Sequence, residues 1–245
     1  MKKIIGILLV SVLTFSACSS DNDENIEKVS ISLKFTHNWD GVSITSSDFN
    51  NFKFTTENGE KISIVKLRYL LSNINLINGN DVYTFSNYNL INLGEETGFI
   101  LNLPEKINQG SYQLKFTFGF ADADNKDGAY QDLNSTSFDV PGMLGGGYHF
   151  MQFDGKYKDT NNQDKNFNYH TIRAVNRTDP NNLVFEDTSF EVDIGTLSFI
   201  NNSEITIKVN IAEWFKNPNK WNLNELNTVL MPNFEAQKMM SANGK

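Results

Sequence analysis

The sequence predicts an all-β protein, an antiparallel β-sandwich or a barrel-like domain, with long loops and short C-terminal helices. The first observation is strict alternation of apolar and polar residues, the period of a half-buried strand, in residues 29–36, 112–120 and 205–211. The second is the recurrence of such segments every 8 to 15 residues or so, roughly the spacing of sandwiches and barrels. The third is a hydrophobic content of 39%, rich in phenylalanine, which can form a sizeable core.

The predicted strands follow one another through turns. Residues 29–36 place His37 at the end of the first strand, just before a turn. Residues 61–78 and 82–85 flank the turn sequence NGND and predict a hairpin. The clean alternation of residues 112–120 predicts a strand at the centre of a sheet. Shorter strands are predicted at residues 88–93, 99–103, 148–153 and 185–194, and short helices at residues 212–216, 224–230 and 236–242.

The first 17 residues predict a bacterial lipoprotein signal peptide. Two lysines precede an apolar run at residues 4–15, which is too short to be a good transmembrane helix. The sole cysteine, Cys18, follows in the sequence FSAC, which resembles a lipobox. Acylation of Cys18 would anchor the chain to the membrane by lipid alone. The alternative is a plain signal peptide in which this cysteine stands by chance.

The rest of the chain divides into a linker and one domain. Residues 18–28 comprise the acylated cysteine and a polar, acidic segment, which predicts a flexible linker. This acidic segment resembles the surface-export signal of Bacteroidetes lipoproteins. We therefore expect an outer-membrane lipoprotein, at the cell surface or facing the periplasm, in which residues 29–245 form a single β-rich domain.

Charge and missing motifs exclude several classes of function. The formal net charge of −8 becomes −10 once Lys2 and Lys3 leave with the signal peptide, which argues against nucleic acid and anionic membrane surfaces as partners. The sequence has no HExxH, GxSxG, P-loop, dinucleotide-binding or CxxCH motif. We expect no enzyme activity, although a pair of glycosidase carboxylates would leave no signature among 29 acidic residues.

The sequence GMLGGGYHFMQFDGKY, residues 142–157, contains candidate metal ligands, a histidine and two methionines, next to a run of three glycines. A strand from Tyr148 onward would place His149 and Met151 on one face, and imidazole with thioether sulfur suits copper, especially Cu(I). The alternative is that the methionine fills a gap in the core. Before it, residues 121–147 predict a long loop that is functional or mobile. Its DADNKDG motif favours a solvated turn over a calcium site, because the bidentate glutamate of an EF-hand is missing.

Several segments carry a family resemblance in the same order along the chain. They resemble the MbnP-like family of copper-binding lipoproteins of the methanobactin-cassette type, which is common in Bacteroidetes. The segments are KFTHNWDG (34–41), LRYLLSNINL (67–76), LKFTFGFADADN (114–125), GYHFMQFDGKY (147–157), FNYH (167–170) and the C-terminal EAQKMMSANGK.

The resemblance implies a β-rich extracytoplasmic domain that binds copper, as Cu(I) or Cu(II), with His37 and His170 on family histidines. Many relatives carry a tryptophan pair before the GY dipeptide, and in one branch a di-haem partner oxidises a tryptophan to kynurenine. This chain has MLGGG there, so that modification is not implied. His149 could then serve as a third ligand, with Met151 on the same face or Met143 across the loop.

The sequence thus predicts a lipid-anchored protein that acquires or handles copper without catalysis, together with an envelope uptake or redox partner. The alternative is a cell-surface module of an uptake complex that binds glycans or proteins. Exposed tryptophans would stack on sugars in such a module, and the candidates are Trp39, Trp214 and Trp221.

Overall fold

The computed structural model describes residues 27–179 and 181–245, so the predicted signal peptide and Cys18 lie outside the described residues. Fifteen strands make up a little less than half of these residues. The strands are β1 (Lys28–Val29), β2 (Ile31–Trp39), β3 (Val42–Ser43), β4 (Phe54–Thr55), β5 (Lys61–Asn78), β6 (Asp81–Asn92), β7 (Ile100–Asn102), β8 (Ile107–Asn108), β9 (Gly110–Phe118), β10 (Met151–Lys158), β11 (Asp164–Thr171), β12 (Ala174–Asn176), β13 (Val184–Glu186), β14 (Phe190–Phe199) and β15 (Ser203–Asn210). The helices are α1 (Gln131–Ser135) and α2 (Phe234–Gly244), with 3-10 turns η1 (Ser46–Asp48), η2 (Gly142–Leu144) and η3 (Ile211–Phe215).

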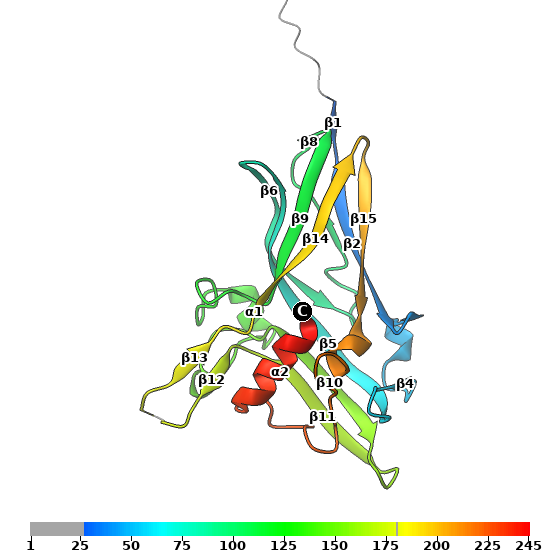
Figure 1. Ribbon diagram of the computed structural model, residues 1–245, viewed down its shortest axis with the longest axis vertical. Coiled ribbons are helices and arrows are strands. Elements are labelled where there is room, and N and C mark those ends of the chain that lie inside the picture. The colour runs from blue at the N-terminus through cyan, green and yellow to red at the C-terminus, as the bar shows by residue number, and fades with distance from the viewer. Residues whose placement is uncertain (1–26, 180) are drawn as a thin grey trace, which may run out of the picture.

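Two β-sheets face each other as a sandwich, which confirms the predicted fold class (Figure 1). The larger sheet has the order β11-β10-β5-β9-β14, with β4 and β6 also paired to β5. The smaller sheet has the order β15-β2-β3, with β7 also paired to β2. The described strands do not close into a barrel, because the larger sheet ends at β14 and the smaller one at β15. Pairing is antiparallel except between β2 and β15, which are parallel.

The core lies between these sheets and follows the alternation in the sequence. On β2, the residues at every second position from Ile31 to Trp39 are buried. Phe35 of β2 meets Phe116 of β9 edge to face, with ring centroids 6.3 Å apart. Full burial of such a side chain stabilises the fold by about 1.5–3 kcal/mol. His37 keeps the inward phase of this strand and is 5% exposed.

The predicted hairpin forms between β5 and β6, and Gly79 takes a positive φ of 60° in its turn. The segment predicted as a separate strand at residues 88–93 continues β6 instead, because β5 is long enough to pair with it throughout. Strand β9 lies between β5 and β14, as its strong alternation indicates.

The long segment between β9 and β10, residues 119–150, lies over the outer face of the larger sheet and contains α1 and η2. Arg68 on β5 holds it there: its Nη2 donates to the carbonyl oxygens of Thr136 and Ser137, at 2.8 and 3.1 Å. The guanidinium also lies over the ring of Phe138, 5.2 Å from its centroid. The predicted loop is therefore tied to the sheet.

The C-terminal region contains one α-helix, α2, after the short turn η3. The prediction of a helix at residues 224–230 is wrong, because backbone groups there bond elsewhere. The carbonyl of Leu226 accepts the indole N–H of Trp221, and that of Asn227 accepts the backbone N–H of Asn168 on β11. None of the helices among the described residues has the length and apolar character needed to span a membrane.

Candidate metal centre

Three neighbouring strands set out the polar face on which the candidate site lies. Arg68 on β5, Gln152 on β10 and His170 on β11 are directly opposite one another in the register. Because strand side chains alternate between faces, the next residues in register, Tyr69, Met151 and Thr171, point to the other face. Tyr69 and Met151 belong to the core. His170 therefore stands on the outer face, beneath the long segment.

His170 is oriented by a carboxylate. Its Nε2 donates to Oδ1 of Asp154 at 2.7 Å, and Asn168 Nδ2 donates to the same oxygen at 2.6 Å. Burial raises the pKa of Asp154, but the hydrogen bonds from His170 and Asn168 and the nearby charge of Lys66 outweigh it and lower this pKa to about 2. With Nε2 donating to Asp154, a neutral His170 ring has its lone pair on Nδ1.

His149 is oriented by a backbone carbonyl. Its Nδ1 lies 3.0 Å from the carbonyl oxygen of Phe138, which can only accept, so Nδ1 donates and Nε2 holds the lone pair. Gln152 Nε2 is 3.3 Å from the same Nδ1, but it donates to the carbonyl of Ser137 at 3.0 Å, and two donors do not bond. Nε2 of His149 is buried and has no hydrogen-bond partner among the described residues.

Leaving that nitrogen unpaired is costly. His149 is 4% exposed, and a buried polar group without a partner costs about 1–3 kcal/mol. Burial, together with the charge of His170, lowers the pKa of His149 to about 4, so the ring is neutral at pH 7. A neutral imidazole with its lone pair on an unpartnered nitrogen is the form that binds a metal ion.

The two rings lie close enough to share one ion. Their centroids are 5.3 Å apart and their planes are nearly perpendicular, at 84°. Two metal–nitrogen bonds of about 2.0 Å to one ion keep imidazole centroids within about 6 Å of each other. Carboxylate and carbonyl partners on the other ring nitrogens are typical of metal-ligating histidines, because they fix the tautomer and raise ligand basicity. In ring separation and in the partners of their other nitrogens, the two histidines therefore form a candidate metal site.

The donor set is small. Within residues 27–179 and 181–245, no group of three or more His, Cys, Asp or Glu side chains is arranged to hold a metal ion. Two imidazoles without an array of oxygen ligands do not suit calcium or magnesium, which take six or more oxygens. Nitrogen ligands suit copper and zinc, and a site with few protein donors suits exchange of its ion.

His37 and Met151 are placed elsewhere. Nε2 of His37 lies 2.8 Å from Oη of Tyr69, and its ring packs against Phe99 with centroids 5.1 Å apart. Burial lowers the pKa of His37 to about 4. Met151 is 1% exposed in the core, on the face opposite His170. The structure thus brings together His149 and His170, and it does not bring His37 or Met151 to them.

The glycine run leads directly into the segment that carries His149. Gly145, Gly146 and Gly147 all have positive φ, and a Cβ on Gly147 would lie 2.4 Å from Oδ1 of Asn125. That oxygen accepts the backbone N–H of Tyr148 at 2.8 Å. Regular strand begins only at Met151, so the expectation that His149 and Met151 share a face is wrong.

Sequence reasoning missed the residues that support the two histidines. Asp154, Gln152 and the carbonyl of Phe138 received no role. A signal was present, because Gln152 and Asp154 share one phase of β10, and Asn168 and His170 share one phase of β11. Such a double polar alternation marks a face that is not core. The bond from Phe138 depends on tertiary structure and leaves no local pattern.

The three tryptophans do not form an exposed strip. Trp39, Trp214 and Trp221 are 4%, 6% and 0% exposed. Trp39 stacks on Phe54, with centroids 5.4 Å apart, and Trp221 packs on Tyr169 at 4.7 Å. Sugar stacking on exposed tryptophans, which was the basis of the glycan-binding alternative, therefore has no support in this arrangement.

Comparison with known proteins adds one family and one structure. A family model described as MbnP matches residues 28–232. Among solved structures, MbnP from Methylosinus trichosporium is similar at 10% sequence identity and a TM-score of 0.45, over 79% of this chain and 86% of that one. No curated protein sequence matches the chain.

Proposed function

The chain belongs to the MbnP family, and from that premise and the geometry of the two histidines we propose that it binds copper between His149 and His170. Copper is its cargo, and the protein acquires or handles the ion without catalysis. The observation that carries this proposal is the Nε2 atom of His149, which is buried and has no hydrogen-bond partner among the described residues. The ring that carries it lies next to the ring of His170, with the two centroids 5.3 Å apart. A histidine that serves packing alone has no reason to leave a buried nitrogen unpaired.

The surroundings favour a monovalent ion. Arg68 lies near His149, and its positive charge contributes to the lowered pKa of that ring. The same charge repels a divalent ion more strongly than a monovalent one. The carboxylate of Asp154 accepts hydrogen bonds from His170 and Asn168 and has Lys66 Nζ 3.5 Å away, so it does little to offset Arg68. We propose that Cu(I), which accepts few ligands of nitrogen or sulfur, is the favoured state.

The two ends of the site differ in exposure, which suits transfer of the ion. His170 is partly exposed, whereas His149 is buried. An ion would therefore enter and leave past His170. We propose that an envelope uptake or redox partner meets the protein at this end.

His37, a ligand by family resemblance, has a different role in this proposal. Its hydrogen bond to Tyr69 lies on the inner face of β5, next to Arg68 on the outer face. We propose that it supports the strand beneath the site instead of binding the ion. The location is also a proposal: lipidation of Cys18 would hold the protein at the outer membrane, outside the cytoplasm.

X-ray absorption of the copper-loaded full chain, after a Cu(I) competition titration with bicinchoninate, tests the proposal. We expect one copper per chain, a first shell of nitrogen or oxygen without sulfur, and no comparable binding of Ca²⁺. Sulfur in the shell would mean that a methionine or Cys18 binds the ion, which would overturn the two-histidine site. Absence of tight copper binding would remove the function altogether.

A further inference from the structure

Strand β15 forms an open edge of the smaller sheet. The sheet has the order β15-β2-β3, so β15 is paired on one side to β2 and has no second strand beside it among the described residues. It runs in continuous register with β2 from Ser203 to Asn210, without a bulge or a proline. An edge strand of this kind presents unpaired backbone N–H and C=O groups, which are a template for pairing with another strand.

The backbone groups of three residues face this open edge. The N–H of Ser203 donates to the carbonyl oxygen of Ser30, just before β2, at 3.0 Å. Because the N–H and C=O groups of successive residues alternate between the two edges of a strand, those of every second residue from Glu204 onward point away from β2. These residues are Glu204, Thr206 and Lys208, and all three are exposed.

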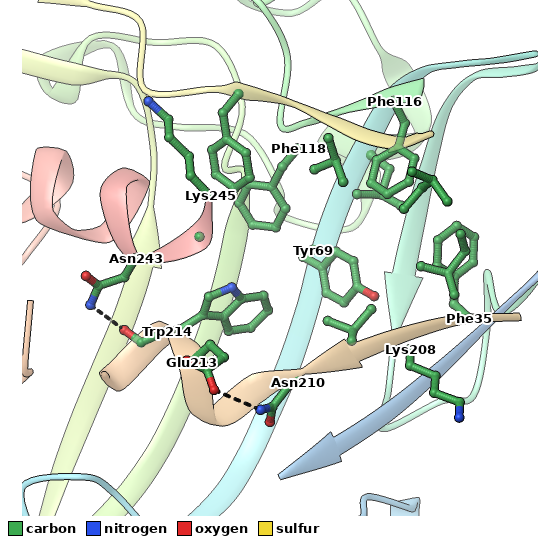
Figure 2. Close-up of a pocket in the computed structure, with 17 residues that line it drawn as sticks. Phe35, Tyr69, Phe116, Phe118, Lys208, Asn210, Glu213, Trp214, Asn243 and Lys245 are labelled. Carbon is green, nitrogen blue, oxygen red and sulfur yellow. Dashed lines mark hydrogen bonds between the residues drawn. The ribbon is translucent and has the colours of Figure 1, made fainter. Parts of the chain in front are cut away.

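The inner face of β15 is apolar and incompletely covered. Ile207 is 8% exposed, whereas Ile205 and Val209 on either side of it are only half-buried. Ile207 and Val209 line a pocket of about 280 Å³ where the two sheets separate (Figure 2). A second strand beside β15 would cover this apolar edge and provide partners for its free backbone groups.

The outer face of β15 carries two opposite charges at equal distances from one threonine. Figure 2 shows Lys208 on the side of β15 away from Tyr69 and the other core side chains. Glu204 shares this outward phase, and Thr206 lies midway between the two along the strand. If a second β15 runs antiparallel with Thr206 opposite Thr206, each Lys208 stands opposite a Glu204. A register centred on Glu204 or on Lys208 would instead place like charges opposite each other, which is destabilising.

The neighbouring edge strand, β14, lacks both properties. Its register with β9 shifts between Asp193 and Gly195, which marks a bulge, and Gly195 has a φ of 92°. A bulge is one of the features by which edge strands avoid pairing. β14 contains the acidic residues Glu191 and Asp193 and no basic residue, so two copies of it cannot place opposite charges together. Of the two strands at this side of the sandwich, β15 is therefore the one suited to association.

We propose that two copies of the chain associate through β15, antiparallel and with Thr206 on the two-fold axis, so that the smaller sheet continues across both. Such an interface is isologous, because the same strand serves both partners. Lys208 of each copy stands opposite Glu204 of the other and exchanges backbone hydrogen bonds with it, and Ile205 stands opposite Ile207 on the inner face. The copper proposal does not depend on this pairing, because the candidate ligands lie at the larger sheet.

Oxidative crosslinking of the full chain tests the register. Thr206→Cys would bring two cysteines to about 5.5 Å between Cα atoms, the separation of a hydrogen-bonded antiparallel pair, which suits a disulfide. We expect a covalent dimer after mild oxidation with diamide. Thr196→Cys, at an exposed threonine on β14, is the matched control, and the unaltered chain shows how much crosslinking Cys18 gives. Crosslinking of Thr206→Cys no greater than that of the two controls would overturn the proposal.

A charge exchange tests the pairing of Lys208 with Glu204. Sedimentation equilibrium of the full chain should show a monomer–dimer equilibrium, which Lys208→Glu weakens by about tenfold because like charges then stand opposite each other at two places. Combining Glu204→Lys with Lys208→Glu restores opposite charges and should return the dimer to within about threefold of the unaltered chain. Circular dichroism shows whether each variant folds. A monomer at every concentration, or a folded double variant that dimerises no better than Lys208→Glu alone, would refute the assignment.

Discussion

A buried histidine lies against each face of the larger sheet, and the two histidines differ in the surroundings of one nitrogen atom. His37 on the inner side and His149 on the outer side are 5% and 4% exposed, and burial lowers the pKa of both to about 4. His37 Nε2 has a hydrogen bond with Tyr69 Oη, whereas His149 Nε2 has no partner among the described residues. Burial and pKa therefore do not distinguish the two rings, whereas the unpaired nitrogen of His149 does.

Removal of single histidines should give the largest difference in copper affinity between the two faces of the sheet. His149→Ala and His170→Ala each delete a proposed ligand, and we expect the Cu(I) affinity to fall by at least about 1,000-fold, since loss of an outer partner alone costs 10–100-fold. His37→Ala should leave the affinity within about twofold. Competition with bicinchoninate measures all three. Loss of copper binding in His37→Ala, with His149→Ala unchanged, would place the ion on the inner face.

Acid should affect the two histidines alike in the copper-free protein. Each has a pKa of about 4 when folded and about 6.5 when unfolded. The unfolded chain therefore binds more protons between pH 6.5 and 4, so stability is complete above pH 6.5 and falls as the pH drops to 4. The loss is about 3 kcal/mol for each histidine.

Urea unfolding at pH 7 and pH 4.5 measures this effect. His37→Gln and His149→Gln should each reduce the acid loss by similar amounts, about 2–3 kcal/mol, although only His149→Gln abolishes copper binding. An unchanged acid loss in His37→Gln would show that its ring is protonated in the fold.

The sequence could predict the position of a histidine where that position depends on neighbours along the chain. It could not do so where the position depends on residues far away in the sequence. Alternation in residues 29–36 and 112–120 predicted β2, β9 and the inward phase of His37, because a strand's period is local. The shared phase of Asn168 and His170 was also correct, since both bond Asp154. The side of the sheet taken by His149 was not predictable, because it depends on where β10 begins and on a carbonyl eleven residues away.

Substitution in the glycine run just before His149 should shift this ring without removing it. Gly147 has a φ of +77°, and a Cβ there would lie 2.4 Å from Asn125 Oδ1, so Gly147→Ala should destabilise the fold by about 1–3 kcal/mol and weaken copper binding through the displaced His149. Gly142→Ala is the control, because nothing lies within 4 Å of its Cβ position. Thermal unfolding and the copper titration report both effects. Equal behaviour of the two variants would mean that the run does not position His149.

Substitution of Asp154, the carboxylate partner of His170, should give the smallest change in copper affinity that still distinguishes the outer face of the larger sheet from the inner one. Asp154→Asn keeps an acceptor for Nε2–H but removes the negative charge that makes the ring more basic, so we expect copper affinity to fall by about tenfold. Lys66→Gln is the matched control: its ammonium is 3.5 Å from Asp154 and its side chain is 48% exposed, so its loss should change affinity by less than about threefold. The hydrogen bond of His37 to Tyr69 on the inner face is untouched by either change. If Asp154→Asn bound copper as tightly as the unaltered protein, the carboxylate would serve the fold of β10 and β11 alone, and His170 would need no orientation to bind its ion.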